Sequence, residues 1–506
     1  MYAIGVDSGT QGTKVLIVDF AGEILGRGYW KHRMTPGLEP GASEQDPGIW
    51  ITAFSKALEE ALDKSKIDPA KVVSIGVSGQ QHGFVPLDRE GIPIRPAKLW
   101  NDTSTIKETE EIITKMGGRK KFIEKTGINL AVGFTASKIL WLKNHEPENY
   151  NKLSTILLPH NYINYYLTGN TVMEFGDASG TGLMNIKERK WSKEVIKTIG
   201  PEIEAKLPAL LHPSEPVGYV KPEITDRYNL KKVIVSGGGG DNMMAAIGTG
   251  NVVPGIVTAS LGTSGTVYAY FSEPFVDPEG EIASFCDSTG GWLPLLCTMN
   301  VTNVTEHLKA VLGFSNEILE NSASKAPAGS NGLIFLPFIS GERVPVLPHS
   351  SGVLFGLNNT NFNKSCISRS IMEGTILNLG YGFNRMKSLN LVPGKIRVTG
   401  GGSNSKLWLK ILADVFHTPV VTLKEQEAGA FGAALQSTWA YYNITGKKIT
   451  IGEITVEMVK EHKEITEPDT GSVSIYRILQ DRFNSLWKTL APEFTLHKSK
   501  ERDMPV

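Results

Sequence analysis

A turn rich in glycine and threonine occurs twice in this chain, and this repeat limits the possible folds more than any other feature. The first copy, Gly9-Thr10-Gln11-Gly12-Thr13, lies between two strand-like runs, and the second, Gly262-Thr263-Ser264-Gly265-Thr266, begins 253 residues later in a chain of 506. Such turns expose backbone N–H groups and hydroxyls that suit phosphate, although similar pairs also form ordinary hairpin turns. The repeat predicts a duplicated α/β domain with an anion bound between the copies.

The length agrees with a duplication. A chain of 506 residues is too long for one core and fits two domains of roughly 250 residues each. We predict a first domain over residues 1–249, a second over 250–498 and a tail over 499–506. The stretch from about 108 to 225 has mostly helical patterns with Pro and Gly breaks, and we interpret it as an insertion on the substrate side.

The composition narrows the range of partners. Lys plus Arg and Asp plus Glu both number 52, so no overall field attracts nucleic acid or a membrane surface. The chain starts with a strand rather than a signal segment and has no run of ~20 apolar residues. Its three cysteines have no C-x-x-C spacing, which argues against a disulfide framework or a zinc site and favours core thiols in a reducing compartment. The composition predicts a cytoplasmic protein that binds small molecules.

Polar clusters follow several predicted strands directly. The apolar run Val72 to Val77 leads into Ser78-Gly79-Gln80-Gln81-His82-Gly83, and Lys232 to Ser236 leads into four glycines and Asp241-Asn242. In open α/β sheets the residues beyond the carboxyl ends of strands line the ligand crevice. We therefore expect these clusters to form a site.

Other segments predict helices and strands around these clusters. Asp46-Pro47 is a typical helix start, with Asp as the N-cap and Pro in the first turn. In the second half we expect a helix from about 365 to 387 and a strand over 396–399 that runs into Gly400-Gly401-Gly402. A helix containing 408–416, a strand over 419–423 and a small-residue helix over 428–437 follow.

The glycine-rich turns at 9–13, 262–266 and 400–402 would suit a triphosphate, whose oxygens are best held by many N–H groups and a metal ion. No G-x-x-x-x-G-K-[ST] sequence occurs, so the chain has no P-loop. Asp7 stands at the end of the first strand, where its carboxylate would face the anion through a hard cation such as Mg²⁺. Lys14 adds a positive charge.

Phosphoryl transfer to an alcohol also needs a carboxylate that accepts the hydroxyl proton. Asp241 is the best candidate, because it follows a glycine-rich approach and precedes the polar Asn242. It could also serve as a helix N-cap, a common role for Asp, and both roles can hold. His82, with Gln81, could bind sugar hydroxyls, and the alternative there is a structural histidine within a turn.

In its motifs the chain resembles the FGGY carbohydrate kinases, and within them most closely the xylulose kinases. The motifs that carry the resemblance extend over roughly 440 residues: GVDSGTQGTK, EQDP with Trp50, SGQQHG, LWND, GFTASK with Leu140-Trp141, GGGGDN, SLGTSG, Phe335-Leu336-Pro337 with SGER, GGGSNS with LW, and Leu412-Ala413-Asp414. A single glycine turn is unspecific, but this ordered set is not.

The resemblance implies two duplicated actin-like (ribonuclease H-like) ATPase domains with a cleft between them, the first binding sugar and the second nucleotide. It implies Mg²⁺ near Asp7 and Asp241 as the base that activates the C5 hydroxyl of an open-chain ketopentose. The remaining implied roles are sugar binding by Gln81, His82, Asp241 and Asn242, and ATP binding by Thr10, Gln11, Gly12, Thr13, Lys14, Gly262, Thr263, Gly401 and Gly402. Relatives of this kind are often dimers, so a homodimer is one assembly to test.

The resemblance implies a leading sugar and leaves an alternative. The leading reaction is ATP-dependent phosphorylation of D-xylulose, since glycerol kinases carry an Arg-Glu pair where this chain has Gln81-His82. However, Ser137 and His160-Asn161 replace the Pro and the Lys-Asp expected in xylulose kinases, so another ketopentose or polyol, such as D-ribulose, is the alternative. A more remote alternative is an actin-like ATPase that acts on no sugar.

Overall fold

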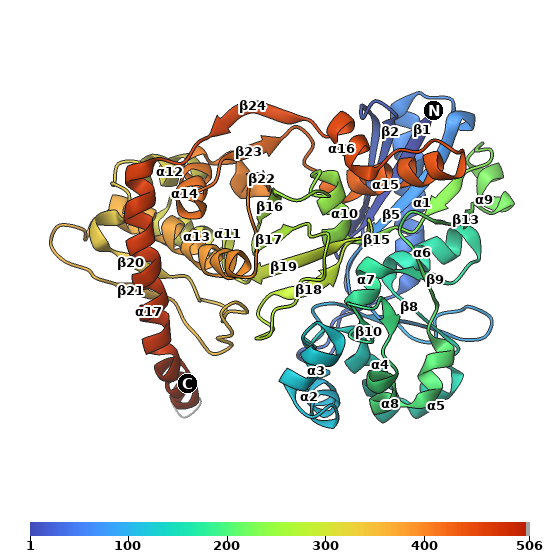
Figure 1. The fold of residues 1–506 in the computed structure, drawn as a ribbon, viewed down its shortest axis with the longest axis horizontal. Helices are drawn as coiled ribbons and strands as arrows, with labels where there is room; N and C mark the ends of the chain where they lie inside the picture. The colour runs from blue at the N-terminus through green and yellow to red at the C-terminus, as the bar shows by residue number, and fades with distance from the viewer. Residues whose placement is uncertain (502–506) are drawn as a thin grey trace. The chain divides into compact units, whose positions relative to one another are not determined.

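The structure is a computed structural model that describes residues 1–501 (Figure 1). Contacts between residues divide the chain into two compact units. Unit 1 contains three segments: Met1–Val253, Tyr270–Pro294 and Glu427–Lys460. Unit 2 contains Pro254–Ala269, Leu295–Gln426 and, of the described residues after these, 461–501. The boundary predicted at 249/250 lies close to the end of the first segment of unit 1. The first domain predicted from the sequence, 1–249, lacks the two later segments that belong to this unit.

The main sheet of unit 1 has the strand order β13-β14-β5-β1-β2-β3, with β15 also paired to β5. Strand β1 pairs antiparallel with β2 and parallel with β5, so the predicted opening hairpin is present. The strands are β1 (Tyr2–Ser8), β2 (Gly12–Asp19), β3 (Ile24–Lys31), β5 (Val72–Gly79), β13 (Pro216–Tyr219), β14 (Ile234–Ser236) and β15 (Gly239–Gly240).

Helix α1 (Pro47–Ser65) packs against β2 and β3. It begins as predicted, since the Asp46 side chain accepts a hydrogen bond from the Gly48 N–H at 2.9 Å and Pro47 opens the first turn. Its apolar side chains, such as Trp50 and Phe54, are fully buried. A Cβ at Gly28 would lie 1.9 Å from the Ala57 carbonyl oxygen, so glycine on β3 permits this close contact between helix and sheet.

Helix α15 (Ala428–Ile444) packs against β1, β5 and α10 (Asp241–Gly248), all in unit 1. Glycines make this packing close: a Cβ at Gly5 would lie 1.9 Å from the Ala430 oxygen, and one at Gly432 would lie 1.8 Å from the Met244 oxygen. The small-residue helix predicted over 428–437 therefore fixes the position of α10 relative to the sheet.

Short helices and strand pairs make up most of the remainder of unit 1. The helices are α2 (Ile106–Lys115), α3 (Arg119–Thr126), α4 (Thr135–His145), α5 (Pro147–Lys152), α6 (Pro159–Thr168), α7 (Phe175–Ser179), α8 (Lys193–Ile199), α9 (Pro222–Arg227) and α16 (Ile451–Met458). The short strands are β4 (Glu44–Gln45), β6 (Val85–Leu87), β7 (Ala97–Lys98), β8 (Thr155–Leu157), β9 (Val172–Glu174), β10 (Met184–Asn185), β11 (Lys190–Trp191), β12 (Ala209–Leu211) and β18 (Ala283–Cys286).

Unit 2 repeats the pairing pattern of unit 1. Strand β16 pairs antiparallel with β17 and parallel with β22, as β1 does with β2 and β5. Within unit 2 the strands follow the order β19-β17-β16-β22-β23-β24, and β19 contributes only residues 295–298 to this unit. These strands are β16 (Ile256–Leu261), β17 (Gly265–Ala269), β19 (Trp292–Thr298), β22 (Lys395–Thr399), β23 (Val420–Leu423) and β24 (Glu461–Thr466), with β20 (Ile334–Leu336) and β21 (Val353–Phe355) forming a separate pair. The predicted duplication of an α/β plan is confirmed.

The helices of unit 2 are α11 (Thr302–Leu312), α12 (Asn316–Ala323), α13 (Lys364–Ser388), α14 (Lys406–Phe416) and α17 (Thr470–Glu501). The predicted helices at 365–387 and 408–416 are thus present. The first three residues of the predicted tail continue α17, and residues 502–506 lie outside the described residues. None of the helices in the described part of the chain is both long and apolar enough to cross a membrane. Cys286 and Cys366 are buried thiols.

Candidate active site

The first glycine-threonine turn borders a cavity of about 770 Å³ in unit 1. Of the predicted site residues, Asp7, Thr10, Gln11, Gly12 and Lys14 line this cavity. Its other charged lining residues come from β3, α1 and the segment before α15: Arg27, Glu60, Lys64 and Glu427. The predicted metal and phosphate residues of the first hairpin therefore share one open space.

Side chains from three other segments hold the turn. Gln45 donates from Nε2 to the Thr10 carbonyl at 2.7 Å, and Trp100 donates from Nε1 to the Thr10 hydroxyl at 3.1 Å. That hydroxyl in turn donates to the Gln80 side-chain oxygen at 3.1 Å. The Thr13 hydroxyl is buried and lies within hydrogen-bond distance of Ser8 and His32. Thr13 therefore faces the interior, whereas Thr10 and Gln11 line the cavity.

Asp7 ends β1 beside the cavity. Ser78 donates a hydrogen bond of 2.7 Å to its Oδ1, and a Cβ at Gly429 would lie within about 3 Å of the carboxylate. Burial raises the pKa of Asp7, while the Ser78 hydrogen bond and the nearby Lys14 oppose the rise. A carboxylate whose charge is disfavoured in this way is stabilised when a cation is present.

Lys14 forms an ion pair with Glu427. Burial disfavours its charge, but the hydrogen bond to Glu427 and the attraction of Glu427 and Asp7 raise the pKa of Lys14. The lysine therefore carries its charge at neutral pH in the cavity that contains Asp7.

Asp241 and Asn242 open helix α10. The Asn242 backbone N–H and side-chain amide donate to Asp241 Oδ1 at 2.7 and 2.9 Å. Gly240, rather than Asp241, occupies the N-cap position, so the N-cap interpretation of Asp241 is wrong. Burial, then the negative charge of Asp7, raises the pKa of Asp241 to about 7, and Asp177 contributes in the same direction.

Gln81 connects the end of β5 to this helix. Its side-chain oxygen accepts a hydrogen bond of 2.8 Å from the Asn242 amide, and its Nε2 lies 3.0 Å from the Met243 sulfur. A Cβ at Gly240 would lie 2.5 Å from Gln81 Cγ, so glycine at that position allows the two segments to meet. The predicted sugar residues Gln81, Asp241 and Asn242 are in direct contact.

His82 is held from several sides. Its backbone has a φ of 60°, a left-handed conformation that costs a non-glycine residue of order 1 kcal/mol. Its carbonyl accepts hydrogen bonds from Lys138 Nζ at 2.6 Å and from the Thr135 hydroxyl at 3.2 Å. The ring packs against Phe134 and Phe285, with centroid distances of 4.5 and 5.4 Å.

Lys138 is a buried amine that links two loops. It donates to the carbonyls of His82 and Gly133, both at 2.6 Å, and burial lowers the pKa of Lys138 to about 7. Lys138 belongs to the motif GFTASK, but the sequence alone assigns this lysine no role. Phe285 could not have been found from the sequence, because it lies more than 200 residues from His82 and in the predicted second domain.

In unit 2 the two remaining turns lie together. A Cβ at Gly402 would lie 2.7 Å from Leu261 Cβ, and one at Gly400 would lie 2.8 Å from the Leu261 carbonyl oxygen. The turn at 400–402 therefore packs against the end of β16, next to Gly262 and Thr263. Gly401 has open space around the position of a Cβ, so a flat ligand could approach its backbone.

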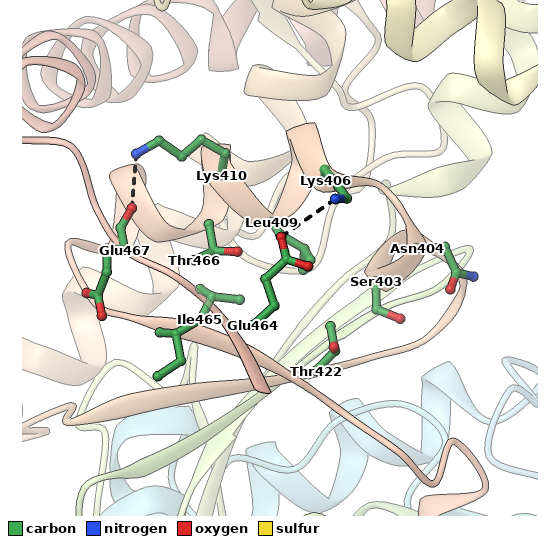
Figure 2. A pocket seen from close by; sticks show the side chains of 11 residues that line it. Ser403, Asn404, Lys406, Leu409, Lys410, Thr422, Glu464, Ile465, Thr466 and Glu467 are labelled. Atoms are coloured by element: carbon green, nitrogen blue, oxygen red, sulfur yellow. Dashed lines mark hydrogen bonds and ion pairs between the residues drawn. The ribbon is translucent and has the colours of Figure 1, made fainter. Parts of the chain in front are cut away.

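A second cavity, of about 410 Å³, lies in unit 2 beside Ser403 and Asn404. Lys410 donates to the Glu467 carbonyl at 3.0 Å, and Lys406 lies 3.6 Å from Glu464 across this space (Figure 2). None of the residues predicted to bind sugar or ATP lines it.

Comparisons with known proteins were made for the whole chain. Residues 2–248 match the model of the N-terminal domain of the FGGY family of carbohydrate kinases, and residues 243–441 match the model of the C-terminal domain. The chain is 42% identical to the xylulose kinase of Haemophilus influenzae over 488 residues, which cover 95% of this chain and 98% of that protein.

Two further relatives extend the comparison. The chain is 30% identical to the xylulose kinase of Escherichia coli over 97% of its length and 99% of that protein. The crystal structure of xylulose kinase from Bifidobacterium adolescentis is similar, with a TM-score of 0.83 and 27% identity over 95% of this chain and 99% of that one.

Proposed function

Since the chain belongs to the FGGY family of carbohydrate kinases, we propose that it transfers the γ-phosphate of ATP to the C5 hydroxyl of D-xylulose, giving D-xylulose 5-phosphate. The observation that carries this proposal is the contact between Gln81, Asn242 and Asp241 in a chain 42% identical to a xylulose kinase over nearly its whole length. The predicted actin-like, two-domain α/β fold supports the same class of reaction.

Asp241 serves as the general base. A base is most effective when its pKa lies near the operating pH, because it is then both deprotonated and basic enough to take a proton. Burial and the Asp7 charge raise the pKa of Asp241 to about 7, which meets this requirement. The hydrogen bonds from Asn242 hold Oδ1, so Oδ2 is the oxygen left for the sugar hydroxyl.

Gln81, His82 and Asn242 bind the sugar. The amide pair of Gln81 and Asn242 is fixed by its mutual hydrogen bond, and the His82 ring is fixed by stacking on two phenylalanines. Rigid polar groups of this kind position a hydroxyl for reaction without a further loss of side-chain entropy.

ATP binding uses backbone N–H groups and one cation from the first hairpin. Thr10, Gln11 and Gly12 line the cavity, and Lys14 supplies the positive charge. Thr13 contributes through its backbone only, since its hydroxyl points inward. In unit 2 we assign Gly262 and Thr263 to the phosphates and Gly401 and Gly402 to the adenosine.

The residues fit Mg²⁺ supplied with ATP. Mg²⁺ in kinases is held by one or two carboxylates together with substrate phosphates and water rather than by a dedicated cage. Asp7 provides such a carboxylate, and no cluster of three or more acidic, His or Cys ligands occurs among residues 1–501. When bound, the ion would neutralise phosphate charge, and Asp7 would hold it.

A specific observation keeps D-ribulose as a second candidate. His160, which replaces the lysine expected in xylulose kinases, is buried against Asp177, and Asp177 faces the His82 ring. The substitution therefore lies directly behind a proposed sugar-binding side chain.

The test is a coupled assay of ADP release with Mg²⁺-ATP and D-xylulose, D-ribulose, L-ribulose, L-xylulose, glycerol or no sugar. We expect the highest kcat/KM with D-xylulose and little ADP without sugar. A preference for D-ribulose would support the second candidate, and ATP hydrolysis indifferent to every sugar would overturn both in favour of an ATPase without sugar kinase activity.

A further inference from the structure

A buried carboxylate, Asp177 in α7, lies behind His82. Its Oδ2 is 2.9 Å from His160 Nδ1, and its Oδ1 is 4.0 Å from His82 Nδ1. The Asp177 side chain is fully buried, and Oδ1 has no hydrogen-bond partner within the described part of the chain. Because an unpaired buried carboxylate oxygen is costly, this oxygen points to a function.

The first imidazole on this carboxylate is that of His160. Its Nε2 lies 2.8 Å from the side-chain amide nitrogen of Asn161. In this arrangement the Asn161 amide donates to Nε2, and the Nδ1 proton is donated to Asp177 Oδ2. His160 thus satisfies one carboxylate oxygen and leaves the other facing His82.

Packing restricts the orientation of the His82 ring. A Cβ at Gly180 would lie 2.2 Å from His82 Nδ1 and Cε1, so the ring edge rests on a glycine backbone. Phe134 and Phe285 pack against the ring, and Lys138 holds the carbonyl of the same residue. Packing fixes the plane of the ring, and what remains to be set is which ring nitrogen carries the proton.

We propose that Asp177 is a positioning residue that holds His82 in the Nδ1–H tautomer and thereby presents Nε2 as a hydrogen-bond acceptor to a sugar hydroxyl. The proton on Nδ1 faces Asp177 Oδ1, and attraction to the carboxylate across the 4.0 Å between Nδ1 and Oδ1 favours this tautomer. This inference rests on the proposed role of His82 in sugar binding.

The tautomer has a consequence for recognition. A neutral Nε2 without a proton accepts a hydrogen bond from a hydroxyl but cannot donate one to a carbonyl oxygen. His82 therefore selects a hydroxyl group of the open-chain sugar rather than its keto oxygen. The side chain is 13% exposed, whereas that of Asp177 is fully buried, in agreement with a sugar on one side of the ring and a carboxylate on the other.

The direct test is ¹⁵N NMR of the full-length protein labelled at histidine, with the His82 signals assigned by their loss in the His82→Gln variant. We expect an Nδ1–H, Nε2-acceptor pattern for His82 with and without D-xylulose. An Nε2–H pattern in the wild-type protein would overturn the proposal, whether or not any variant folds. This readout needs no kinase activity, so it separates a failure of the tautomer from a failure of the proposed function.

The kinetic test uses Asp177→Asn, which keeps the size of the side chain but removes its charge. We expect kcat/KM for D-xylulose to fall about tenfold or more, mainly through KM, while KM for ATP changes less than twofold. In the His82→Gln background the same substitution should have little further effect, because coupled residues are not additive. Asp226→Asn, the same change at an exposed position of α9, is the matched control. A normal kcat/KM for Asp177→Asn, or full additivity with His82→Gln, would overturn the proposal.

Discussion

The β1-β2 hairpin of unit 1 and the β16-β17 hairpin of unit 2 share the sequence pattern Gly-Thr-x-Gly-Thr but form different turns. In the first, Ser8 pairs with Thr13 and four residues, 9–12, form the turn. In the second, Leu261 pairs with Gly265 and three residues, 262–264, form it. The same residue types therefore adopt two registers one residue apart.

Buried contacts of Thr13 distinguish the first hairpin. The Thr13 hydroxyl is buried against Ser8 and His32, which holds that residue in the ladder of unit 1. Both hairpins need glycine at the next position back, since a Cβ at Gly12 would lie 2.5 Å from the Tyr29 ring and one at Gly265 would lie 2.7 Å from Val301. Register depends on what each face of a strand meets.

The two hairpins also differ in charge. Asp7 and Lys14 flank the first turn and face each other across the strand pair. At the corresponding positions before and after the second turn stand Ser260 and Val267. The charged groups that we propose for phosphate and metal therefore belong to the first copy, and the second copy offers mainly backbone. The predictions below test this division of roles.

The largest loss of kcat is expected for a substitution of Asp241, which lies in unit 1 together with Asp7 and Lys14. Asp241→Asn removes the proposed base but keeps the shape of the side chain, and loss of a general base costs about 10²–10⁴-fold in kcat. Nucleotide affinity, measured by calorimetry, should stay within about twofold because the adenosine and phosphate contacts are assigned elsewhere. Turnover within tenfold of the wild type would exclude Asp241 as the base.

The matched pair Asp7→Asn and Ser260→Ala tests the comparison of the two hairpins directly. We expect Asp7→Asn to lower kcat about 10²–10³-fold and to raise the Mg²⁺ concentration needed for half-maximal rate, because charge stabilisation at the phosphates is lost. Ser260→Ala should change kcat less than about threefold. Equal losses in the two variants would contradict the assignment of the charged chemistry to the first copy.

The pH dependence follows from the raised pKa of Asp241. The base acts when deprotonated, so kcat/KM for the sugar should rise tenfold per pH unit on the acid side and then level off. Burial and the charge of Asp7 raise the pKa of Asp241 to about 7. A bound cation would weaken the repulsion from Asp7 and so lower this pKa. The midpoint of the rise in kcat/KM should therefore lie no higher than about pH 7. A rate that increases toward acid pH, measured at saturating Mg²⁺-ATP, would contradict a carboxylate base.

Helices α10 and α14 extend the comparison, since each follows a glycine-rich turn. Helix α14 is packed by large side chains, including Phe416 stacked on Phe383 at 4.1 Å, whereas α10 meets α15 through glycine. Gly432→Ala would place a Cβ 1.8 Å from the Met244 oxygen, and overpacking costs about 1–3 kcal/mol. We expect the thermal midpoint of unfolding to fall by about 5 °C and kcat to fall with it, because α10 carries Asp241.

The control for this variant is Gly452→Ala in α16, where the new Cβ would lie 3.3 Å from a Val253 methyl. Calorimetry should show a much smaller shift for it. Comparable shifts for the two variants would show that the contact between α10 and α15 is not specially tight.

The elements of this fold were largely predictable because their signals are local. The cap at Asp46 and the helix predicted over 365–387 both appear in the structure, the latter as Lys364–Ser388. The assignment of α15 to unit 1 was not predictable from the sequence. It depends on packing between distant segments, because Ala430 of α15 meets Gly5 of β1 and Gly432 of α15 meets Met244 of α10. For the same reason the residues behind His82, namely Asp177, Lys138 and Phe285, were not identified from the sequence.

The smallest expected effect concerns the Lys14–Glu427 ion pair, which has no counterpart in the second hairpin because Val267 replaces the lysine. Glu427 competes with phosphate for the Lys14 ammonium, so Glu427→Gln should lower KM for ATP about two- to threefold and leave KM for the sugar unchanged. The effect is small because the two side chains are 40% and 37% exposed, where solvent weakens an ion pair.

Glu59→Gln is the control for Glu427→Gln, since Glu59 pairs with Lys56 and Arg227, and none of these three residues lines the cavity; it should leave KM for ATP unchanged. The decrease in KM for Glu427→Gln should be larger at low ionic strength, because salt screens the competing attraction. A rise in KM for ATP would instead show that Glu427 orients Lys14 toward the phosphate rather than competing with it. Nucleotide binding at the first hairpin would then depend on Glu427 as much as on Asp7 and Lys14.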